Sequence, residues 1–436
     1  MADNNLTCEV LVAGAGPAGL AAACLVARAG VSTIAVGPVA GAGDTRTTAL
    51  FGGAMRTLAH LGADKALAGK GAPLQGLRIV DRLRRTDHPS SLHFPASEIG
   101  LEAFGTNYRN LDLLAALEGV GAHFPALTRI HGTIARYRHH GAGVAAELAD
   151  GRHIRAQVVA ACDGRDSPAR DAAGIAATTW DYGQIALAFQ IGHQIPHRNV
   201  SIEVHRPGGP LTFIPLPGDS SAVNWLVPPQ DAEKLKALDD HGFVEALFEA
   251  SGGALGRFFE PGARVGFPIG GLLVDTLAKN RTVLIGEAAH VLPPIGAQGL
   301  NLGFRDAATF AGLAIDAVRN RGDAGHANVA AAYRAARARD VMTRRAATDL
   351  LNRSLLLGGG AMPHLRGLGL VLLASSAGAR RKLMTEGMGI KDDRTVFAGE
   401  AASLLPEHGK QIEGELPLGH QDHHQWQGKQ RQRGGD

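Results

Sequence analysis

The stretch Val10-Leu11-Val12-Ala13-Gly14-Ala15-Gly16-Pro17-Ala18-Gly19 decides the fold, because an apolar strand runs directly into glycines at the spacing Gly-x-Gly-x-x-Gly. A small-residue helix and a second apolar strand, Thr33 to Val36, follow. In this pattern Gly14 permits a tight turn, Gly16 lets the backbone approach a pyrophosphate, and Gly19 lets the helix pack closely on the strand. The N-terminus therefore predicts one βαβ unit that binds a dinucleotide.

The usual acidic partner of this motif is missing. An Asp or Glu about 20 residues beyond the glycines normally holds the ribose hydroxyls. That place is Gly37-Pro38 here, and no Asp or Glu occurs from Val10 to Gly43. We expect the adenosine ribose to be held by backbone groups or by a residue from elsewhere, or to be bound more weakly. The motif alone does not distinguish NAD from FAD.

Two later apolar strands also end at chemically marked loops. Val158 to Cys162 leads into Asp163-Gly164-Arg165-Asp166-Ser167-Pro168-Ala169-Arg170, and Thr282 to Ile285 leads into Gly286-Glu287-Ala288-Ala289-His290. An acidic side chain at a strand end can accept hydrogen bonds from sugar-like hydroxyls. Three buried strands thus finish at loops suited to a nucleotide.

A glycine-rich run follows the third of these strands. Pro293-Pro294 and Gly296-Ala297-Gln298-Gly299-Leu300-Asn301-Leu302-Gly303 precede Asp306. Such a run lets a planar ring lie against bare backbone amides. A helix that begins near Leu300 would point its positive end at that ring.

The rest of the chain divides by pattern. Residues from about Gln184 to Phe267 contain short strand-like pieces, Pro and Gly turns and one expected helix near Asp231 to Glu249, which is typical of a separate sheet inserted into the nucleotide fold. From Gln298 to about Arg345 the sequence is helical and Ala-rich, and beyond Lys391 it loses periodicity.

Composition excludes several classes of protein. The chain has 436 residues with 44 Lys plus Arg against 41 Asp plus Glu, a net charge of +3, and no basic run dense enough to track a nucleic acid. Its three cysteines, Cys8, Cys24 and Cys162, are far apart and lack a CxxC pair, which argues against disulfides and zinc. No basic region precedes the first apolar stretch, so no secretory signal is expected. We expect a cytoplasmic protein.

These three motifs, in this order and spacing, resemble the flavoprotein aromatic hydroxylases of the para-hydroxybenzoate hydroxylase type, the class A flavoprotein monooxygenases. Within that group the chain looks most like the ubiquinone-biosynthesis hydroxylases, from about Glu9 to Gly389. The matching positions also include Asp44-Thr45-Arg46-Thr47-Thr48-Ala49-Leu50, Pro196-His197, Tyr333, Arg337, Asp340 and Asp349.

The resemblance implies FAD and NAD(P)H as cofactors. In this family NAD(P)H reduces FAD, O2 adds to the flavin, and the hydroperoxide delivers one oxygen atom to an electron-rich ring. The chemistry is centred on the flavin, so no side chain is assigned as catalytic and no metal is expected.

Carried over residue by residue, the resemblance also implies the cofactor site. Glu287 stands where the family usually has an Asp that contacts the ribityl chain, and Arg46 matches a position close to the flavin. The expected cofactor-binding residues are Gly14, Gly16, Pro17, Ala18, Gly19, Arg46, Asp163, Gly164, Arg170, Gly286, Glu287, Pro294, Gly296, Gln298, Gly299, Leu300 and Asn301.

Structural roles for some of these residues remain open alternatives. Asp163 can cap a turn, Arg170 can form a surface ion pair, and Glu287 can act as a helix N-cap. For His290 we favour a packed histidine beneath the flavin over an acid–base catalyst. Cys162 is expected to be a buried, small apolar residue.

The resemblance implies an α/β fold, in which a Rossmann-like FAD-binding domain carries an inserted, mostly antiparallel β-sheet substrate domain and C-terminal helices. The expected parts are 1–74, 100–180 and 276–320 for the FAD-binding domain, 75–99 and 181–275 for the substrate domain, 321–391 for the C-terminal helices, and 392–436 for a disordered tail.

The expected substrate is a prenylated phenol intermediate of ubiquinone biosynthesis, in a pocket that includes Phe189, Phe213 and Trp225. The apolar segment Gly367 to Ala379 is too short to span a bilayer. A packed helix is favoured there, and peripheral contact with the inner face of the membrane is the alternative. For the protein as a whole, peripheral membrane contact or a quinone-biosynthesis protein complex is the expected further partner.

The sequence leaves other functions open. The alternatives are a hydroxylase of a soluble aromatic compound, a related flavin-dependent reductase, and a non-catalytic flavoprotein scaffold of a quinone-biosynthesis complex. A flavin halogenase is disfavoured, because the chain lacks the Trp-x-Trp-x-x-Pro element. His420, His423 and His424 in the tail have no supporting Cys or carboxylates, so no metal site is expected there.

Overall fold

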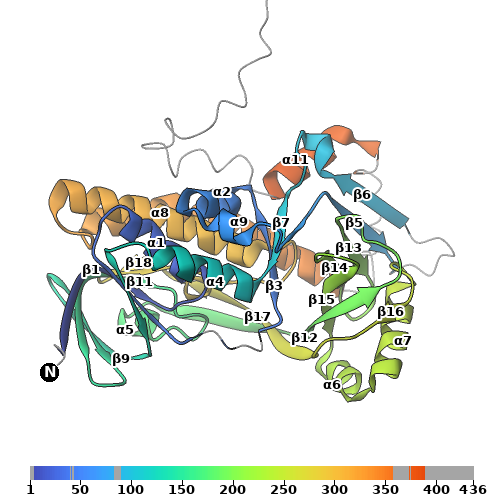
Figure 1. Ribbon diagram of the computed structural model, residues 1–436, viewed down its shortest axis with the longest axis horizontal. Coiled ribbons are helices and arrows are strands. Elements are labelled where there is room, and N and C mark those ends of the chain that lie inside the picture. The colour runs from blue at the N-terminus through green and yellow to red at the C-terminus, as the bar shows by residue number, and fades with distance from the viewer. Residues whose placement is uncertain are drawn as a thin grey trace, which may run out of the picture. The chain divides into compact units, whose positions relative to one another are not determined.

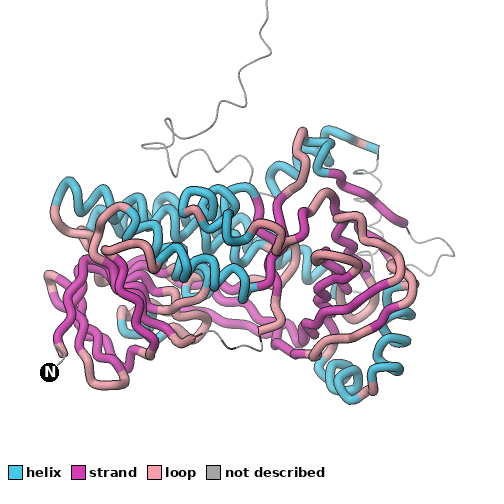
Figure 2. Tube along the Cα trace, in the orientation of Figure 1, coloured by secondary structure: helices cyan, strands magenta, loops and turns pink. Residues whose placement is uncertain are grey.

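The computed structural model of the protein describes residues 4–39, 41, 44–82, 90–356, 373 and 375–387. The predicted tail at 392–436 and most of the segment Gly367 to Ala379 lie outside the described residues. No helix in the described part of the chain combines the length and apolar character that a membrane crossing requires. Figures 1 and 2 show two large sheets side by side, with helices along one side of the first.

The first sheet is built on the predicted βαβ unit. Strand β1 (Asn5–Ala13) lies between two parallel partners, β2 (Thr33–Gly37) and β11 (His153–Ala161), and β11 pairs in parallel with β19 (Thr282–Leu284). The four residues at the end of β1 and the four at the end of β11 are at most 1% exposed. Continuous apolar runs are expected for parallel strands that are covered on both faces.

The remaining strands of this sheet extend its two edges. They are β8 (Leu127–His131), β9 (Ile134–His140), β10 (Gly143–Leu148) and β18 (Ala278–Lys279). Strand β8 pairs in parallel with β2, whereas β10 and β18 pair antiparallel with β11 and β19.

Four helices pack together beside the first sheet (Figure 1). They are α1 (Pro17–Arg28), α4 (Asn110–Gly121), α8 (Gln298–Arg321) and α9 (Ala327–Leu356). The predicted helical region after Gln298 is therefore two helices, because Gly322 takes a left-handed conformation (φ 68°) and ends α8. The short helix α5 (Pro168–Ala172) contacts β9 and β11 instead.

Among the described residues, the second sheet has nine strands and confirms the predicted, mostly antiparallel insertion. Its order is β20-β17-β12-β15-β14-β13-β5-β6, with β16 beside β12, and only the β13–β5 pair is parallel. The strands are β5 (Gly76–Asp81), β6 (Ser90–Pro95), β12 (Ala177–His193), β13 (Val200–His205), β14 (Leu211–Pro215), β15 (Ser220–Val227), β16 (Phe258–Phe259), β17 (Val265–Val274) and β20 (His290–Val291).

Two helices, α6 (Pro229–Ala237) and α7 (Asp240–Ser251), pack near one face of this sheet. The single helix expected near Asp231 to Glu249 is thus wrong. Leu238 is extended, and the Asp239 carboxylate accepts a hydrogen bond from the backbone N–H of Gly242 (2.7 Å), which starts a second helix.

Smaller elements join the two sheets. A three-stranded sheet contains β3 (Thr47–Phe51), β4 (Ala72–Pro73) and β7 (Gly105–Arg109). The other short helices are α2 (Gly52–Leu61), α3 (Ala63–Leu67), η1 (Ala96–Ile99), η2 (Gly286–Ala288) and α11 (Ala377–Gly387).

Candidate cofactor-binding site

The first sheet brings the three predicted loops to one edge. Ala13, Ala161 and Leu284 lie side by side on β1, β11 and β19, so all three strands end at the same level. Backbone hydrogen bonds continue past these ends: Cys162 donates to Ala13 (2.7 Å) and Ile285 donates to Ala161 (2.9 Å). The carboxyl edge of a parallel sheet is where such folds bind ligands.

The glycines of the first loop have different surroundings. Gly14 has φ 108°, and a Cβ there would lie 2.1 Å from the carbonyl oxygen of Cys162. A Cβ at Gly19 would lie 2.2 Å from the carbonyl oxygen of Gly14. A Cβ at Gly16 would meet nothing within 4 Å. Gly14 and Gly19 therefore close the turn, while Gly16 leaves a bare backbone beside open space.

Helix α1 begins at this open space. Gly16 is its N-cap, Pro17 is its first residue, and its first turn has no acidic residue. The first backbone N–H groups of a helix lack partners within the helix and attract anions. These residues fit a pyrophosphate.

The missing ribose carboxylate has a steric explanation. A Cβ at Gly37 would lie 2.6 Å from both the backbone nitrogen and the Cβ of Ala15, so the first loop leaves no room for a side chain there. Instead, Arg129 of β8 donates to the carbonyl oxygens of Gly37 (3.0 Å) and Pro38 (3.1 Å). Sequence reasoning missed Arg129, because its position follows from the β2–β8 pairing rather than from a motif.

Asp163 and Arg170 hold their own loop together. The Asp163 carboxylate accepts hydrogen bonds from the Ser167 hydroxyl and from the backbone N–H of Ala169 (3.0 Å). Burial raises the pKa of this carboxyl. Arg170, 6% exposed, donates to the carbonyl oxygens of Arg165 (2.8 Å) and Ala288 (3.3 Å). The contacts thus match the capping alternative for Asp163, and Arg170 ties the second loop to the third.

Glu287 is an available carboxylate at this edge. Its side chain is exposed, and its oxygens have no hydrogen-bond partner within the described residues. Arg46 forms two hydrogen bonds to Asp44 (2.8 and 2.9 Å), and its guanidinium lies over the ring of Phe267, 5.5 Å from the centroid. The pKa of Arg46 is raised, first by Asp44 and in part by Glu287. Arg46 therefore lies between the third loop and β17 of the second sheet.

Gln298 and Asn301 already use their side chains within the protein. Gln298 accepts a hydrogen bond from Arg344 (2.6 Å) and donates to the carbonyl oxygens of Gly296 (2.9 Å) and Gly387 (3.0 Å). Asn301 accepts from the backbone N–H of Phe51 (2.9 Å) and donates to the Ala49 carbonyl oxygen (2.8 Å). These two side chains shape the loop, which leaves its backbone to meet a ligand.

The remaining predicted residues lie around the same loops. A Cβ at Gly164 or at Gly299 would meet nothing within 4 Å. A Cβ at Gly303 would lie 3.1 Å from Ala18 and 3.5 Å from Gly286, so small residues let α1, η2 and α8 meet. Pro294 lies in the loop between β20 and α8, and Leu300 lies in the first turn of α8.

A buried charge network supports the third loop from behind. The Asp306 carboxylate, 1% exposed, accepts hydrogen bonds from His290 (2.7 Å), Arg337 (2.7 Å) and the backbone N–H of Gly286 (3.1 Å). Burial opposes ionisation of Asp306, but Arg337 and His290 outweigh it and hold its pKa well below the usual range. His290 is itself 2% exposed, which matches a packed histidine.

The predicted substrate residues do not face this edge. Phe189, Phe213 and Trp225 are at most 2% exposed and pack in one core with Phe243 of α7. The rings of Phe189 and Phe243 lie 4.9 Å apart. The choice of these aromatic residues as pocket residues is corrected, because alternation along the strands turns them toward the covered face of the sheet.

Comparisons with known proteins agree with this geometry. The FAD binding domain family matches residues 7–346. The ubiquinone hydroxylase UbiL of Rhodospirillum rubrum is 30% identical over 388 residues, which cover 87% of this chain and 89% of the relative. The 3-demethoxyubiquinol 3-hydroxylase of Escherichia coli is 25% identical over 68% of this chain and 76% of its own.

Solved structures share the fold. PqsL of Pseudomonas aeruginosa, described as a probable FAD-dependent monooxygenase, superposes with a TM-score of 0.70 at 20% identity and covers 84% of this chain and 99% of its own. The family match spans most of the chain, and the glycine cradle, the exposed Glu287 carboxylate and the uncapped start of α1 fit a flavin dinucleotide. The chain belongs to the FAD binding domain family and is a FAD-dependent monooxygenase.

Proposed function

We propose that the protein hydroxylates the ring of a prenylated phenol intermediate of ubiquinone biosynthesis with NAD(P)H and O2. The alignment with the Rhodospirillum rubrum ubiquinone hydroxylase over 87% of this chain carries the choice of substrate class. The convergence of three loops at one sheet edge supports the proposal that FAD binds there.

The chain's own groups would hold FAD along this edge. The backbone at Gly16 and the start of α1 would bind the pyrophosphate, and Glu287 would accept hydrogen bonds from the ribityl hydroxyls. The bare backbone at Gly299, in the first turn of α8, would face the ring, where the helix end adds partial positive charge. When bound, FAD would accept electrons from NAD(P)H and transfer one oxygen atom of O2 to the substrate ring.

The substrate would bind against the second sheet, on the face opposite to the one covered by α6 and α7. Gln190, Ile214 and Ala222 lie side by side on β12, β14 and β15, opposite in alternation to Phe189 and Phe213. The amide of Gln190 makes a long hydrogen bond to the carbonyl oxygen of Thr45 (3.4 Å), next to Arg46. Ile214 packs against the apolar cluster that includes Phe51. An aromatic ring held against this face would lie beside the cofactor loops.

The same contacts support the proposed division of labour between the sheets. The first sheet, with its three loops, would form the FAD-binding part within 1–74, 100–180 and 276–320. The second sheet would form the substrate part within 75–99 and 181–275.

Deletion of the gene tests the proposal. We expect the deletion strain to lose ubiquinone and to accumulate a prenylated phenol that lacks one ring oxygen, as measured by mass spectrometry of its lipids. An unchanged lipid profile that persists after deletion of any second hydroxylase gene would count against a quinone substrate and favour a soluble aromatic compound.

A second measurement separates an enzyme from a flavoprotein scaffold. The purified, FAD-loaded protein should lose its flavin absorbance when NADH or NADPH is added without oxygen. A scaffold would bind FAD but leave the nicotinamide unconsumed.

A further inference from the structure

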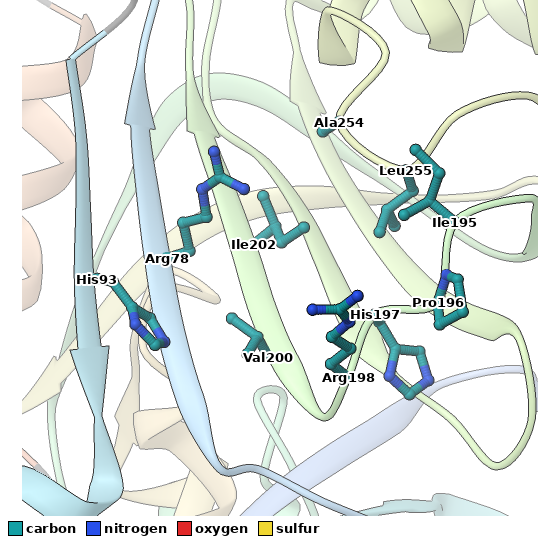
Figure 3. A pocket seen from close by; sticks show the side chains of 10 residues that line it. All are labelled: Arg78, His93, Ile195, Pro196, His197, Arg198, Val200, Ile202, Ala254 and Leu255. Atoms are coloured by element: carbon teal, nitrogen blue, oxygen red, sulfur yellow. The ribbon is translucent and has the colours of Figure 1, made fainter. Parts of the chain in front are cut away.

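A separate cavity of about 440 Å³ opens on the second sheet, away from the cofactor loops. Strands β5, β6 and β13, the loop before β13 and the turn after α7 line it (Figure 3). On its apolar side it is lined by Ile195, Ile202 and Leu255. Nothing in the proposed hydroxylation uses this cavity.

Positive and titratable side chains gather at its rim. Arg78, His93 and Arg198 all line the cavity and are exposed. Figure 3 shows the guanidinium groups of Arg78 and Arg198 on two sides of Ile202. The described residues that line the cavity include no Asp or Glu.

The two arginines are free to bind an anion. Arg78 donates from Nε to the Ser91 hydroxyl (3.0 Å), which fixes the side chain and leaves its two terminal nitrogens available. Within the described part of the chain, neither Arg78 nor Arg198 forms an ion pair with a carboxylate. Guanidinium groups in such a position bind carboxylates and phosphates through paired hydrogen bonds.

The loop that carries Arg198 is held in an unusual conformation. Arg198 and Asn199 have φ of 50° and 58°, a left-handed region that residues with a Cβ rarely adopt. His197 fixes this loop, because its Nδ1 accepts from the Asn199 N–H (3.0 Å) and its Nε2 donates to the Leu216 carbonyl oxygen (2.9 Å). The backbone N–H of Gln75 also donates to the Asn199 carbonyl oxygen (2.8 Å). Arg198 is thus presented to the cavity by a fixed loop.

The apolar side of the cavity is partly open to solvent. Ile202 of β13 is 5% exposed and Leu255 is 1% exposed, whereas Ile195 is 50% exposed and supplies most of the exposed apolar surface. A ligand that is only an anion would leave this apolar surface in water. A ligand with an apolar chain or ring would cover it.

We propose that this cavity binds an anionic amphiphile, a molecule that ends in a carboxylate or phosphate and continues into an apolar chain. Arg78 and Arg198 bind the anionic end, and Ile195, with the buried Ile202 and Leu255 behind it, contacts the chain. Alternation places Arg78 and Ile202 on the face opposite Leu77 and the cluster around Phe94, so the site is independent of the cofactor edge.

Calorimetric titration of the full-length, FAD-loaded protein with octyl phosphate tests the site. We expect binding to weaken at least tenfold in the double variant Arg78→Gln/Arg198→Gln. The matched control Arg155→Gln/Arg257→Gln removes the same charge from exposed arginines outside the cavity and should bind as the wild type does. Equal affinity of the two double variants would overturn the proposal.

Two further ligands separate the head from the chain. Inorganic phosphate should bind more weakly than octyl phosphate and lose its binding in the Arg78→Gln/Arg198→Gln variant. Octyl glucoside, which has the chain without the charge, should bind weakly and equally to both double variants. Octyl glucoside binding as tightly as octyl phosphate would show an apolar site without anion recognition and contradict the proposal.

Sedimentation with vesicles distinguishes the two sources of such a ligand. Arginine-dependent binding to phosphatidylglycerol vesicles, but not to phosphatidylcholine vesicles, would identify a lipid headgroup. Binding of octyl phosphate without vesicle binding would identify a free amphiphile. Flavin absorbance and thermal unfolding of each variant should match the wild type, which separates failure of this site from failure of the hydroxylase.

Discussion

The two sheets present their ligand-facing groups in different ways. In the first sheet the cofactor loops follow strand ends, and glycines determine their shape. A Cβ at Gly14 would clash with a backbone carbonyl, whereas Gly16 leaves its backbone open to a ligand. In the second sheet the proposed substrate surface is one face of long strands, and alternation decides which side chains reach it. In the proposed arrangement, backbone positions define the cofactor side, and the alternation of side chains along the strands defines the substrate side.

The largest expected effect comes from the charge network behind the cofactor loops. Asp306→Asn removes the carboxylate that Arg337 and His290 share in the core, while the buried Arg337 guanidinium keeps Asp340 (2.8 Å) as a partner, so a loss at the lower end of the following range is expected. Breaking a buried ion pair from one side destabilises a protein by about 3–5 kcal/mol. Chemical denaturation at pH 7 should show a loss of this size in the variant.

The pH dependence of the same variant sharpens this prediction. The pKa of Asp306 is depressed in the folded protein, so its ionised form stabilises the fold above the ordinary Asp value of about 3.9. That contribution is lost as the pH falls below about 4 and through the lower folded-state value. The difference in stability between wild type and Asp306→Asn should narrow as the pH falls. A constant difference down to pH 2 would show that the effect is packing rather than charge.

Two neighbouring residues of β14, whose side chains lie on opposite faces of the sheet, test which face meets the substrate. Phe213→Ala removes a core ring that is 1% exposed and stacked 5.4 Å from Phe258, which should destabilise the protein by about 3–5 kcal/mol. Ile214→Ala lies on the other face and should change KM for the substrate more than stability. Thermal unfolding and steady-state kinetics of both variants measure this contrast. A KM change in the folded Phe213→Ala protein without one in Ile214→Ala would reverse the assignment of faces.

Two glycines of the first loop give the matching test on the cofactor side. Gly14→Ala places a Cβ against the Cys162 carbonyl at φ 108° and should destabilise the protein by at least ~2 kcal/mol. Gly16→Ala meets open space, so the fold should persist while FAD affinity falls. Denaturation and flavin titration of both variants separate these outcomes. Normal FAD binding by Gly16→Ala would mean that the pyrophosphate does not approach this backbone.

The sequence predicts the local motifs of the first sheet better than the contacts between residues that are distant in the chain. The three strand ends and the glycine spacing are local patterns, so the edge where Gly14, Asp163 and Gly286 meet is predictable from the order of residues alone. Hydrogen-bond partners that are distant in sequence are not predictable in this way. Nothing near Asn301 in the sequence indicates that its side-chain amide forms hydrogen bonds with the backbone of Phe51 and Ala49. The aromatic residues of the insertion are misassigned by sequence reasoning because hydrophobic alternation identifies a face without saying what covers it.

The smallest expected effect concerns the ribityl contact. Glu287 is exposed and has no hydrogen-bond partner among the described residues, so Glu287→Ala should leave stability nearly unchanged. Loss of the proposed hydrogen bonds to the ribityl chain should weaken FAD binding about tenfold, equivalent to about 1.4 kcal/mol. Glu287→Asp keeps the charge and should retain most of the affinity, as measured by flavin fluorescence during dilution. Equal FAD retention in the Ala and Asp variants would place the ribityl contact elsewhere on the edge, and the cofactor side would then depend on backbone groups alone.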